Sequence, residues 1–385
     1  MPHSFVPTGG VARVRHEPAS MPRGAGCGVP PDPWASVSCM RSTRHKGGAE
    51  GHTVLMSGHR RRPRALPALA VTAMALLLTA CGAPAAEDED RTRITPDSAA
   101  PIAGTFDVGE GREMYLECAG SGSPRVLIIP GQRATVQEWQ SVGEDQSAPP
   151  VFEQVAAQTR VCSYDRPGTP HDGTATSRSS PAPMPTNAEV MARDLRALLE
   201  AAGETGPTVL VAHSLGGLPG LLYTADHPDE VLGLILVDAL TPELRRAETP
   251  GQWQVQKLLL SGDVAAMTAE YPDIEYADVD ASMDQVEARY GDLPGIPYIV
   301  LTADEEWGPI VERMVADGAV PPIVPPDFGY LLDEAQRVSR PVTAALIPGG
   351  VWISETDSGH IMHHDQPQLV ADTILGMVDE LRAAG

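Results

Sequence analysis

The chain has 385 residues, 51 of them acidic and 28 basic, so its formal net charge at neutral pH is −23. Ten of the basic and three of the acidic residues lie in residues 1–80, which leaves 18 basic and 48 acidic residues in the remainder and a net charge there of −30. Such a negative domain is not attracted to nucleic acid or to an anionic bilayer by its charge, so we expect no nucleic-acid partner.

The first 55 residues carry no apolar periodicity and are rich in proline, glycine, arginine, serine and histidine. A later methionine, Met56, opens a pattern of its own, with arginines at positions 60, 61, 62 and 64 before an apolar run over residues 65–80. A basic segment followed by such a run is typical of an export signal. We therefore expect translation to begin at Met56 and residues 1–55 to be absent from the mature protein.

The apolar run ends in Leu78-Thr79-Ala80-Cys81, which resembles the lipobox of bacterial lipoproteins. The resemblance implies that residues 56–81 are a lipoprotein signal peptide and that Cys81 becomes the lipidated first residue. A plain secretory signal and a transmembrane anchor are the alternatives, although a spanning helix needs about 20 apolar residues. We expect an exported protein, lipid-anchored to the outer face of the cytoplasmic membrane or secreted, with an acidic linker over residues 82–103.

Residues 104–385 alternate between short apolar runs and amphipathic stretches, which predicts an α/β domain with a mostly parallel sheet. An antiparallel hairpin is predicted over residues 105–118. Buried strands are predicted over residues 125–129, 161–164, 208–211, 231–237 and 298–302. A helix is predicted to begin at a capping box of Thr186 and Glu189 and to end at Gly203, and another to close the chain.

The stretch over residues 207–223, PTVLVAHSLGGLPGLLY, predicts a strand, a sharp turn and a helix. At the turn, Ala212-His213-Ser214-Leu215-Gly216 matches the nucleophile elbow G-x-S-x-G except at Ala212. Small residues two before and two after the serine are a steric requirement of so tight a turn. Ser214 would then be exposed above the sheet, with the Leu215 N–H directed at an oxyanion. The bland alternative is a strand-to-helix junction that happens to carry a serine.

This elbow occurs together with three further motifs, namely PGQ at residues 130–132, DRPG at 165–168, and SGH followed by DQP at 358–367. Together they resemble the α/β-hydrolase family from about Gly104 to the C-terminus. The resemblance implies an eight-stranded, mostly parallel sheet flanked by helices, with a short helical cap over residues 241–294 after strand six. It also nominates Gln132 for the second oxyanion N–H, although Pro130 stands where the family often has histidine, and it gives the DRPG turn a structural role.

A serine nucleophile needs a base within hydrogen-bond reach and a carboxylate that orients the base. The SGH motif nominates His360 as the base, whereas His213 is expected to pack in the elbow and His363 and His364 to be solvated. The acid stays open. Asp238, at the end of the strand over residues 231–237, is preferred because the later strand end lacks the family's G-x-x-D pattern. The alternatives there are Glu306 and then Asp304.

Five cysteines divide clearly: Cys27 and Cys39 lie in the discarded segment, Cys81 is the lipidation candidate, and Cys118 and Cys162 remain. Two cysteines left in an exported domain suggest one disulfide. The family resemblance agrees, because it makes their two strands neighbours in the sheet. Metal binding is disfavoured, since no histidine accompanies either cysteine at ligand spacing.

These features together predict an exported serine hydrolase that cleaves carboxylic esters through an acyl-enzyme, with no metal or organic cofactor required. A peptidase or amidase of the same fold, similar to proline-releasing aminopeptidases, is the first alternative. A non-catalytic binding protein on the hydrolase fold is the second. The substrate is expected to be a small-molecule ester or amide, and the oligomeric state stays open.

Overall fold

The computed structural model describes residues 100–171 and 177–384. The predicted signal peptide with Cys81, the segment 1–55 and most of the predicted linker lie outside these residues. The predicted linker end at residue 103 is slightly late, because strand β1 (Ile102–Gly109) already begins at Ile102. Within the described ranges, no helix is both long and apolar enough to span a bilayer.

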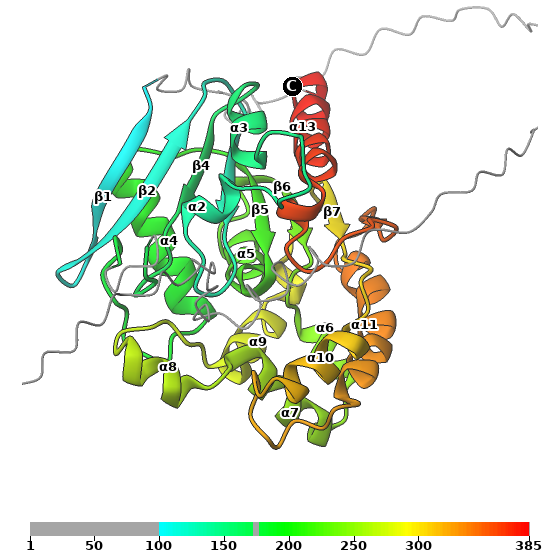
Figure 1. Ribbon diagram of the computed structural model, residues 1–385. Coiled ribbons are helices and arrows are strands. Elements are labelled where there is room, and N and C mark those ends of the chain that lie inside the picture. The colour runs from blue at the N-terminus through cyan, green and yellow to red at the C-terminus, as the bar shows by residue number, and fades with distance from the viewer. Residues whose placement is uncertain (1–99, 172–176, 385) are drawn as a thin grey trace, which may run out of the picture.

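The described domain is built on one eight-stranded sheet in the order β1-β2-β4-β3-β5-β6-β7-β8 (Figure 1). The remaining strands are β2 (Arg112–Ala119), β3 (Arg125–Ile129), β4 (Val161–Tyr164), β5 (Thr208–His213), β6 (Val231–Val237), β7 (Tyr298–Leu301) and β8 (Val351–Ile353). β1 pairs antiparallel with β2, and β2 pairs antiparallel with β4, whereas the pairs from β4 to β8 are parallel. This is the predicted eight-stranded, mostly parallel sheet.

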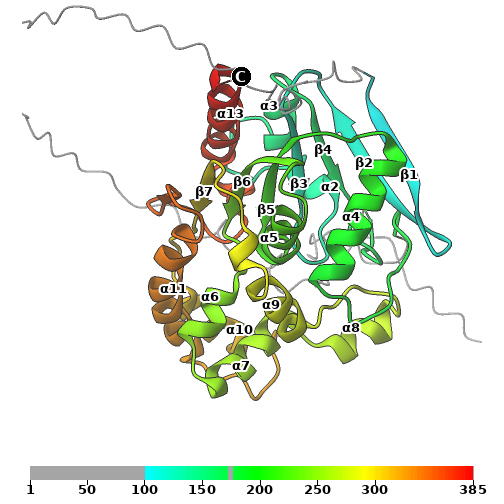
Figure 2. The same cartoon turned by 180° about the vertical axis from the view of Figure 1, so that it is seen from behind.

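Helices cover both faces of the sheet, so its central strands are apolar throughout. Alternate residues of a strand point to opposite faces: Val126 and Val209 belong to one apolar cluster, and Leu127 and Leu210 to the other. Helices α3 (Val151–Ala156) and α13 (Pro367–Ala384) pack in the first cluster. Helices α4 (Ala188–Ala202) and α5 (Gly217–Asp226) pack in the second, as Figure 2 shows from behind.

A helical layer lies beyond the carboxyl ends of the parallel strands, at the lower end of the molecule in Figure 1. After β6 it contains α6 (Pro242–Ala247), α7 (Pro250–Ser261), α8 (Val264–Glu270), α9 (Val279–Glu287) and the 3-10 turn η3 (Tyr290–Asp292). These helices fall inside the predicted cap. Two more, α10 (Trp307–Ala316) and α11 (Phe328–Ala344), lie between β7 and β8, and α11 packs against α6 and α7. The roof over the sheet is therefore larger than the predicted cap.

Helix α4 begins one residue later than the predicted capping box. Its N-cap is Asn187, whose side chain accepts a hydrogen bond from the Val190 N–H. Thr186 cannot serve as the N-cap of this helix because its extended backbone is bonded to the helical layer over the sheet. Its N–H donates to the Tyr276 carbonyl, and its carbonyl accepts from the Asp278 N–H. The prediction of Thr186 was wrong because this long-range pairing is not visible in the local sequence.

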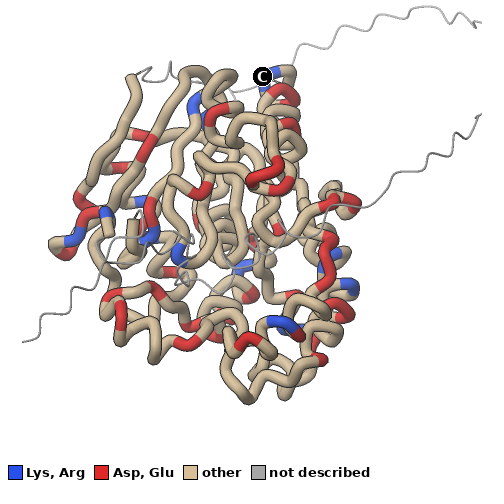
Figure 3. The backbone as a smooth tube through the Cα atoms, viewed as in Figure 1, with Lys and Arg blue, Asp and Glu red and all other residues tan. Residues whose placement is uncertain are grey.

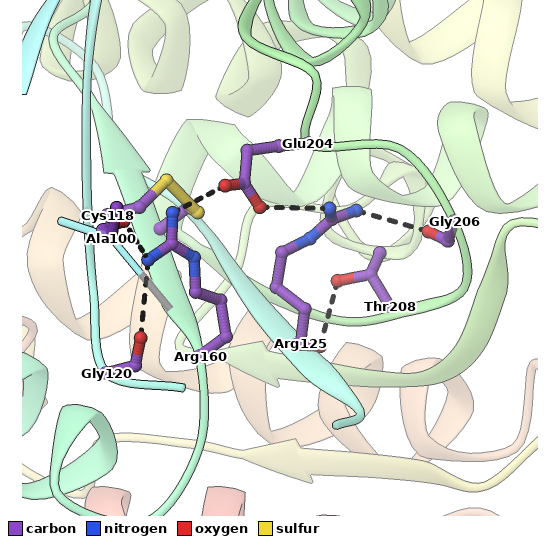
Figure 4. Close-up of a disulfide and its surroundings, with 9 residues drawn as sticks. Ala100, Cys118, Gly120, Arg125, Arg160, Glu204, Gly206 and Thr208 are labelled. Carbon is purple, nitrogen blue, oxygen red and sulfur yellow. Dashed lines mark hydrogen bonds and ion pairs between the residues drawn. A yellow bond between two sulfur atoms is a disulfide. The ribbon is translucent and has the colours of Figure 1, made fainter. Parts of the chain in front are cut away.

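Cys118 and Cys162 face each other directly across the antiparallel pair of β2 and β4, with 4.1 Å between their Cα atoms. The structure joins them by a disulfide (Figure 4). Beside it, the buried Glu204 carboxylate pairs with both Arg125 and Arg160. The guanidinium of Arg160 also donates to the Ala100 carbonyl at 2.8 Å, which holds the start of the described chain at this edge.

Acidic residues are spread through both the sheet layer and the cap, and basic residues are fewer (Figure 3). This distribution agrees with the excess of acidic residues after residue 80. A domain with such a net charge repels anionic polymers at low salt.

Candidate active site

The turn at Ser214 has the sharp geometry that its motif predicts. β5 runs into a 3-10 turn, η2 (Ser214–Gly216), which leads directly into α5. The φ angle of Ser214 is +52°, in the left-handed region that costs a non-glycine residue about 1–2 kcal/mol. A Cβ on Gly216 would lie 2.6 Å from the Ile129 carbonyl oxygen, so glycine is required there. Ser214 thus occupies a strained turn that tight packing holds in place.

The departure from the motif at Ala212 has a local explanation in helix α5. A Cβ on Gly220 would lie 2.9 Å from the Cβ of Ala212, closer than two such atoms can approach. The methyl group of Ala212 therefore occupies the space that glycine leaves free on the facing helix. The elbow accepts alanine in this chain because Gly220 compensates for it.

Three of the predicted residues come together at the carboxyl ends of the strands. His360 Nε2 lies 2.9 Å from Ser214 Oγ, and His360 Nδ1 lies 2.7 Å from Asp238 Oδ2. Ser214 follows β5, Asp238 follows β6, and His360 lies on the loop between β8 and helix α12 (Met362–Asp365). All three side chains are largely buried, and the histidine joins the serine to the carboxylate.

Asp238 is held in the ionised form by its neighbours. Its second oxygen, Oδ1, accepts hydrogen bonds from the Ala303 N–H at 3.1 Å and from Arg340 of α11 at 3.2 Å. Burial by itself raises the pKa of Asp238, but the hydrogen bond with His360 and the charge of Arg340 outweigh it and lower the pKa below its ordinary value. The carboxylate can therefore orient a histidine and stabilise its protonated form.

The two alternative acids occupy other places. Asp304 accepts hydrogen bonds from the backbone N–H groups of Thr356, Asp357 and Ser358, so it shapes the loop that leads to His360. Glu306 is the N-cap residue of α10. Of the three predicted carboxylates, the structure brings Asp238 into hydrogen-bond contact with His360.

The backbone after β3 passes close to Ser214. A Cβ on Gly131 would lie 3.2 Å from the Cβ of Ser214 and 2.9 Å from the ring of His213, so a larger residue would collide with the elbow. Gln132, the predicted second donor, is the next residue and is half-buried. Leu215 lies at the start of the elbow helix, where the first N–H groups have no partner inside the helix and can bind an anion.

Glu275, in the cap, anchors this turn and was missed from the sequence. Its carboxylate accepts a hydrogen bond from the Arg133 N–H at 3.0 Å and forms a buried ion pair with Arg166 of the DRPG motif. Arg133 has a φ of +57°, so its conformation depends on these contacts. The structural role predicted for the DRPG turn is therefore specific: Arg166 orients the cap residue that holds the turn beside Ser214.

A cavity of about 70 Å³ opens from Ser214 and His360 into the roof. Its wall combines aliphatic and polar side chains from α6, α7 and α11. The lining includes Leu244, Leu260, Leu332, Gln256, Gln336 and Thr343. A cavity in which polar groups converge beside apolar ones is a candidate site for a small molecule.

The histidines near the site differ from the prediction in one case. His213 is 2% exposed and packs in the elbow as expected, and burial lowers its pKa to about 3. His363 is fully buried, so the expectation that it is solvated was wrong. Its ring stacks on Trp139 of helix α2 (Val136–Trp139), with 4.0 Å between ring centroids. His364 is half-buried, and its Nε2 contacts the Glu138 carbonyl oxygen at 2.6 Å.

Three comparisons with known proteins bear on this site. The Bacillus subtilis protein YqjL, described as uncharacterized, is 20% identical over 261 residues, which cover 65% of this chain and 82% of its own length. An Azorhizobium caulinodans protein with the provisional name carbamate hydrolase RutD is 28% identical over 190 residues, or 47% of this chain and 63% of its own. A solved esterase from Thermogutta terrifontis has a TM-score of 0.42 and 21% identity, with coverages of 74% and 99%.

The family assignment rests on a sequence profile. The profile of the alpha/beta hydrolase family matches residues 126–373, more than half of the chain and most of the described domain. The matched range includes the elbow, the strand end at Asp238 and the loop of His360. The chain therefore belongs to the alpha/beta hydrolase family.

Proposed function

We propose that the protein is a serine hydrolase that cleaves carboxylic esters with short acyl groups through an acyl-enzyme. The observation that carries this proposal is the row of contacts from Ser214 through His360 to Asp238, at 2.9 Å and 2.7 Å, at the wall of a cavity. In serine acyl transfer, a carboxylate orients a histidine, and the histidine activates the serine hydroxyl.

The mechanism follows from the atoms in contact. Ser214 Oγ attacks the substrate carbonyl carbon while His360 Nε2 takes the hydroxyl proton, and Asp238 stabilises the imidazolium that forms. The backbone N–H groups of Leu215 and Gln132 bind the oxyanion, each contributing about 3–4 kcal/mol to lowering the barrier. His360 then returns the proton to the leaving alcohol, and a water molecule, activated in the same way, hydrolyses the acyl-enzyme.

The preference for short acyl groups is inferred from the size of the cavity. Pockets for small molecules usually have volumes of roughly 300–1,000 Å³, whereas this cavity has about 70 Å³. So small a cavity favours an acetyl or butyryl group over an octanoyl chain unless the roof moves.

An amidase or carbamate hydrolase is the second candidate. It is favoured by one observation, the provisional name of the Azorhizobium caulinodans relative. The same triad cleaves both bonds, because the chemistry differs mainly in the leaving group that His360 must protonate.

The test is labelling of the purified protein with a fluorophosphonate, followed by hydrolysis of p-nitrophenyl acetate, butyrate and octanoate and of peptide p-nitroanilides. We expect the wild type to be labelled and both Ser214→Ala and His360→Ala to abolish the labelling. Turnover by the wild type should fall from the butyrate ester to the octanoate ester. Faster turnover of anilides than of esters would favour the amidase. A folded wild-type protein that fails to label would favour a non-catalytic binding protein.

We also propose that the protein is exported and held at the membrane by a lipid on Cys81, on the basis of the lipobox-like sequence. We expect the wild-type protein to incorporate radiolabelled palmitate in cells, and Cys81→Ala to lose this incorporation. Release of the wild-type protein into the medium without palmitate would favour a plain secretory signal.

A further inference from the structure

Three ionisable side chains from separate segments meet directly behind the elbow. They are Glu138 of α2, His213 at the end of β5, and His363 of α12. One potential ligand atom from each lies within 4.8 Å of the others. Glu138 Oε1 is 3.2 Å from His363 Nε2 and 3.8 Å from His213 Nδ1. Ligand atoms around a tetrahedral zinc ion, each about 2.0–2.1 Å from the metal, lie roughly 3.3 Å apart.

The hydrogen bonding of His213 leaves a lone pair facing the carboxylate. Its Nε2 lies 3.0 Å from the carbonyl oxygen of His360, and since a carbonyl can only accept, Nε2 must carry the hydrogen. In the neutral ring, Nδ1 is then an acceptor, and it lies 3.8 Å from Glu138 Oε1. Nδ1 and Glu138 Oε1 have no hydrogen-bond partner among the described residues. Two buried acceptors that face each other are unfavourable without a cation between them.

His363 completes the group. It is fully buried, and neither of its ring nitrogens has a hydrogen-bond partner in the described part of the chain. Stacking on Trp139 fixes the plane of the ring, and Nε2 lies 3.2 Å from Glu138 Oε1. A buried imidazole whose two ring nitrogens have no partner among the described residues is available as a metal ligand.

We propose that Glu138, His213 and His363 bind one divalent transition-metal ion, with zinc the best fit to two imidazoles and a carboxylate. Oxygen-only sites suit magnesium and calcium, whereas imidazole ligands select zinc and its neighbours. The bond from His213 Nε2 to a backbone carbonyl is the outer contact that metal-bound histidines usually make. The expectation that no metal is required rested on the chemistry of the triad and on the spacing around the two cysteines, and neither can detect ligands brought together by the fold.

The ion would connect three segments that carry the proposed catalytic groups. His213 precedes Ser214, Glu138 lies on the helix that follows the turn at Gly131, and His363 lies three residues after His360. Its role is structural, because the ion would fix these segments relative to one another behind the nucleophile. The inference does not depend on ester hydrolysis, and its test does not measure activity.

The experiment uses the full-length protein, stripped with a chelator and then titrated with zinc chloride by calorimetry. Wild type is compared with Glu138→Gln and His363→Gln. The matched controls are Glu153→Gln, on the exposed face of α3, and His364→Gln, the neighbouring histidine. We expect the wild type and both controls to bind one equivalent of zinc. The zinc affinity of each test variant should be at least tenfold lower. Zinc should also raise the Tm of wild type but not that of the two test variants.

A second measurement covers the case in which the variants do not fold. Zinc K-edge absorption of the loaded wild-type protein should report only nitrogen and oxygen donors, with imidazole scattering, at about 2.0–2.2 Å. The proposal would be overturned if the wild type bound no zinc, or if its spectrum showed sulfur donors. It would also be overturned if folded Glu138→Gln kept the zinc affinity and the Tm response of the wild type.

Discussion

The two ends of the central strands hold their buried charges in different ways. At the amino ends of β3, β4 and β5, Glu204 pairs with Arg125 and Arg160 beside the disulfide. Both arginines are at least 95% buried, and each contacts the carboxylate. Each buried charge at this end therefore has an opposite charge next to it, which is the condition for tolerating it in the interior.

At the carboxyl ends the polar groups are matched less completely. Ser214 and Asp238 both have positive φ angles, and the Glu138 carboxylate faces a histidine acceptor. Strained and incompletely matched groups concentrate where a fold binds or transforms a ligand. The comparison teaches that one end of the sheet is organised for stability and the other for chemistry, and it predicts that substitutions at the two ends change different properties.

The largest expected effect is on catalysis at the carboxyl end. Asp238→Asn should lower kcat for p-nitrophenyl acetate about 10⁴-fold, because the amide no longer holds the reactive tautomer of His360. The change in the free energy of unfolding should be small beside that. Glu306→Gln serves as the control and should keep nearly full activity. Full activity in Asp238→Asn together with loss in Glu306→Gln would assign the acid to the later strand end.

A substitution at the amino end should show the opposite pattern. Glu204→Ala leaves two buried guanidinium groups without their carboxylate, so we expect the free energy of unfolding in urea to fall by about 3–5 kcal/mol. Activity per folded molecule should stay unchanged. Glu200→Ala, which removes an exposed pair with Arg196, should lower the free energy of unfolding far less. If the two changes cost the same, the buried pairs are not what stabilises this end.

The fit between Ala212 and Gly220 offers a test of packing beneath the turn at Ser214. Gly220→Ala places a methyl group 2.9 Å from the Cβ of Ala212 and should destabilise the domain by about 1–3 kcal/mol. Adding Ala212→Gly should restore most of that loss, so a double-mutant cycle measured by urea unfolding should show strong coupling. Additive effects of the two substitutions would mean that the methyl groups do not compete for one space.

The smallest expected effect concerns Glu248, between α6 and α7. Burial raises the pKa of its carboxyl to about 7, and neither oxygen has a hydrogen-bond partner among the described residues. The folded state therefore favours the neutral acid, and its stabilising contribution, complete below about pH 4.5, is lost as the pH rises through 7. Glu248→Gln should raise Tm by about 2–4 °C at pH 8.5 and hardly at pH 5.

The exposed Glu153→Gln is the control for this pH dependence and should leave Tm unchanged at both pH values. The effect at Glu248 is kept small because the side chain is partly open to solvent, which screens the buried charge. Equal Tm differences for Glu248→Gln at pH 5 and pH 8.5 would contradict the raised pKa.

The features predicted from the sequence were those that a short segment encodes by itself. The family, the sheet and the sharp turn at Ser214 all rest on local apolar runs and on small residues at fixed spacing. The choice among Asp238, Glu306 and Asp304 could not be made in this way. Each carboxylate follows a strand, and only the packed sheet brings Asp238 to the ring of His360.

The features missed were those that depend on distant partners. His363 looks like an exposed residue of a polar segment, and its burial depends on the ring of Trp139, which comes from another part of the chain. Glu275 and Arg340 are ordinary charged residues in the sequence, and their contacts with Arg133 and Asp238 form only when the roof packs on the sheet. A pattern within one segment carries no information about such pairs.

The bond from Arg160 to the Ala100 carbonyl has a consequence for the proposed lipid anchor. It fixes the start of the described chain at the amino ends of the strands, and a strand of five or six residues is about 17–20 Å long. Ser214 and its cavity lie beyond the other ends. If a lipid holds the protein by Cys81, the tether pulls on the side away from the cavity. The point of attachment would then leave the opening of the cavity accessible to dissolved substrates.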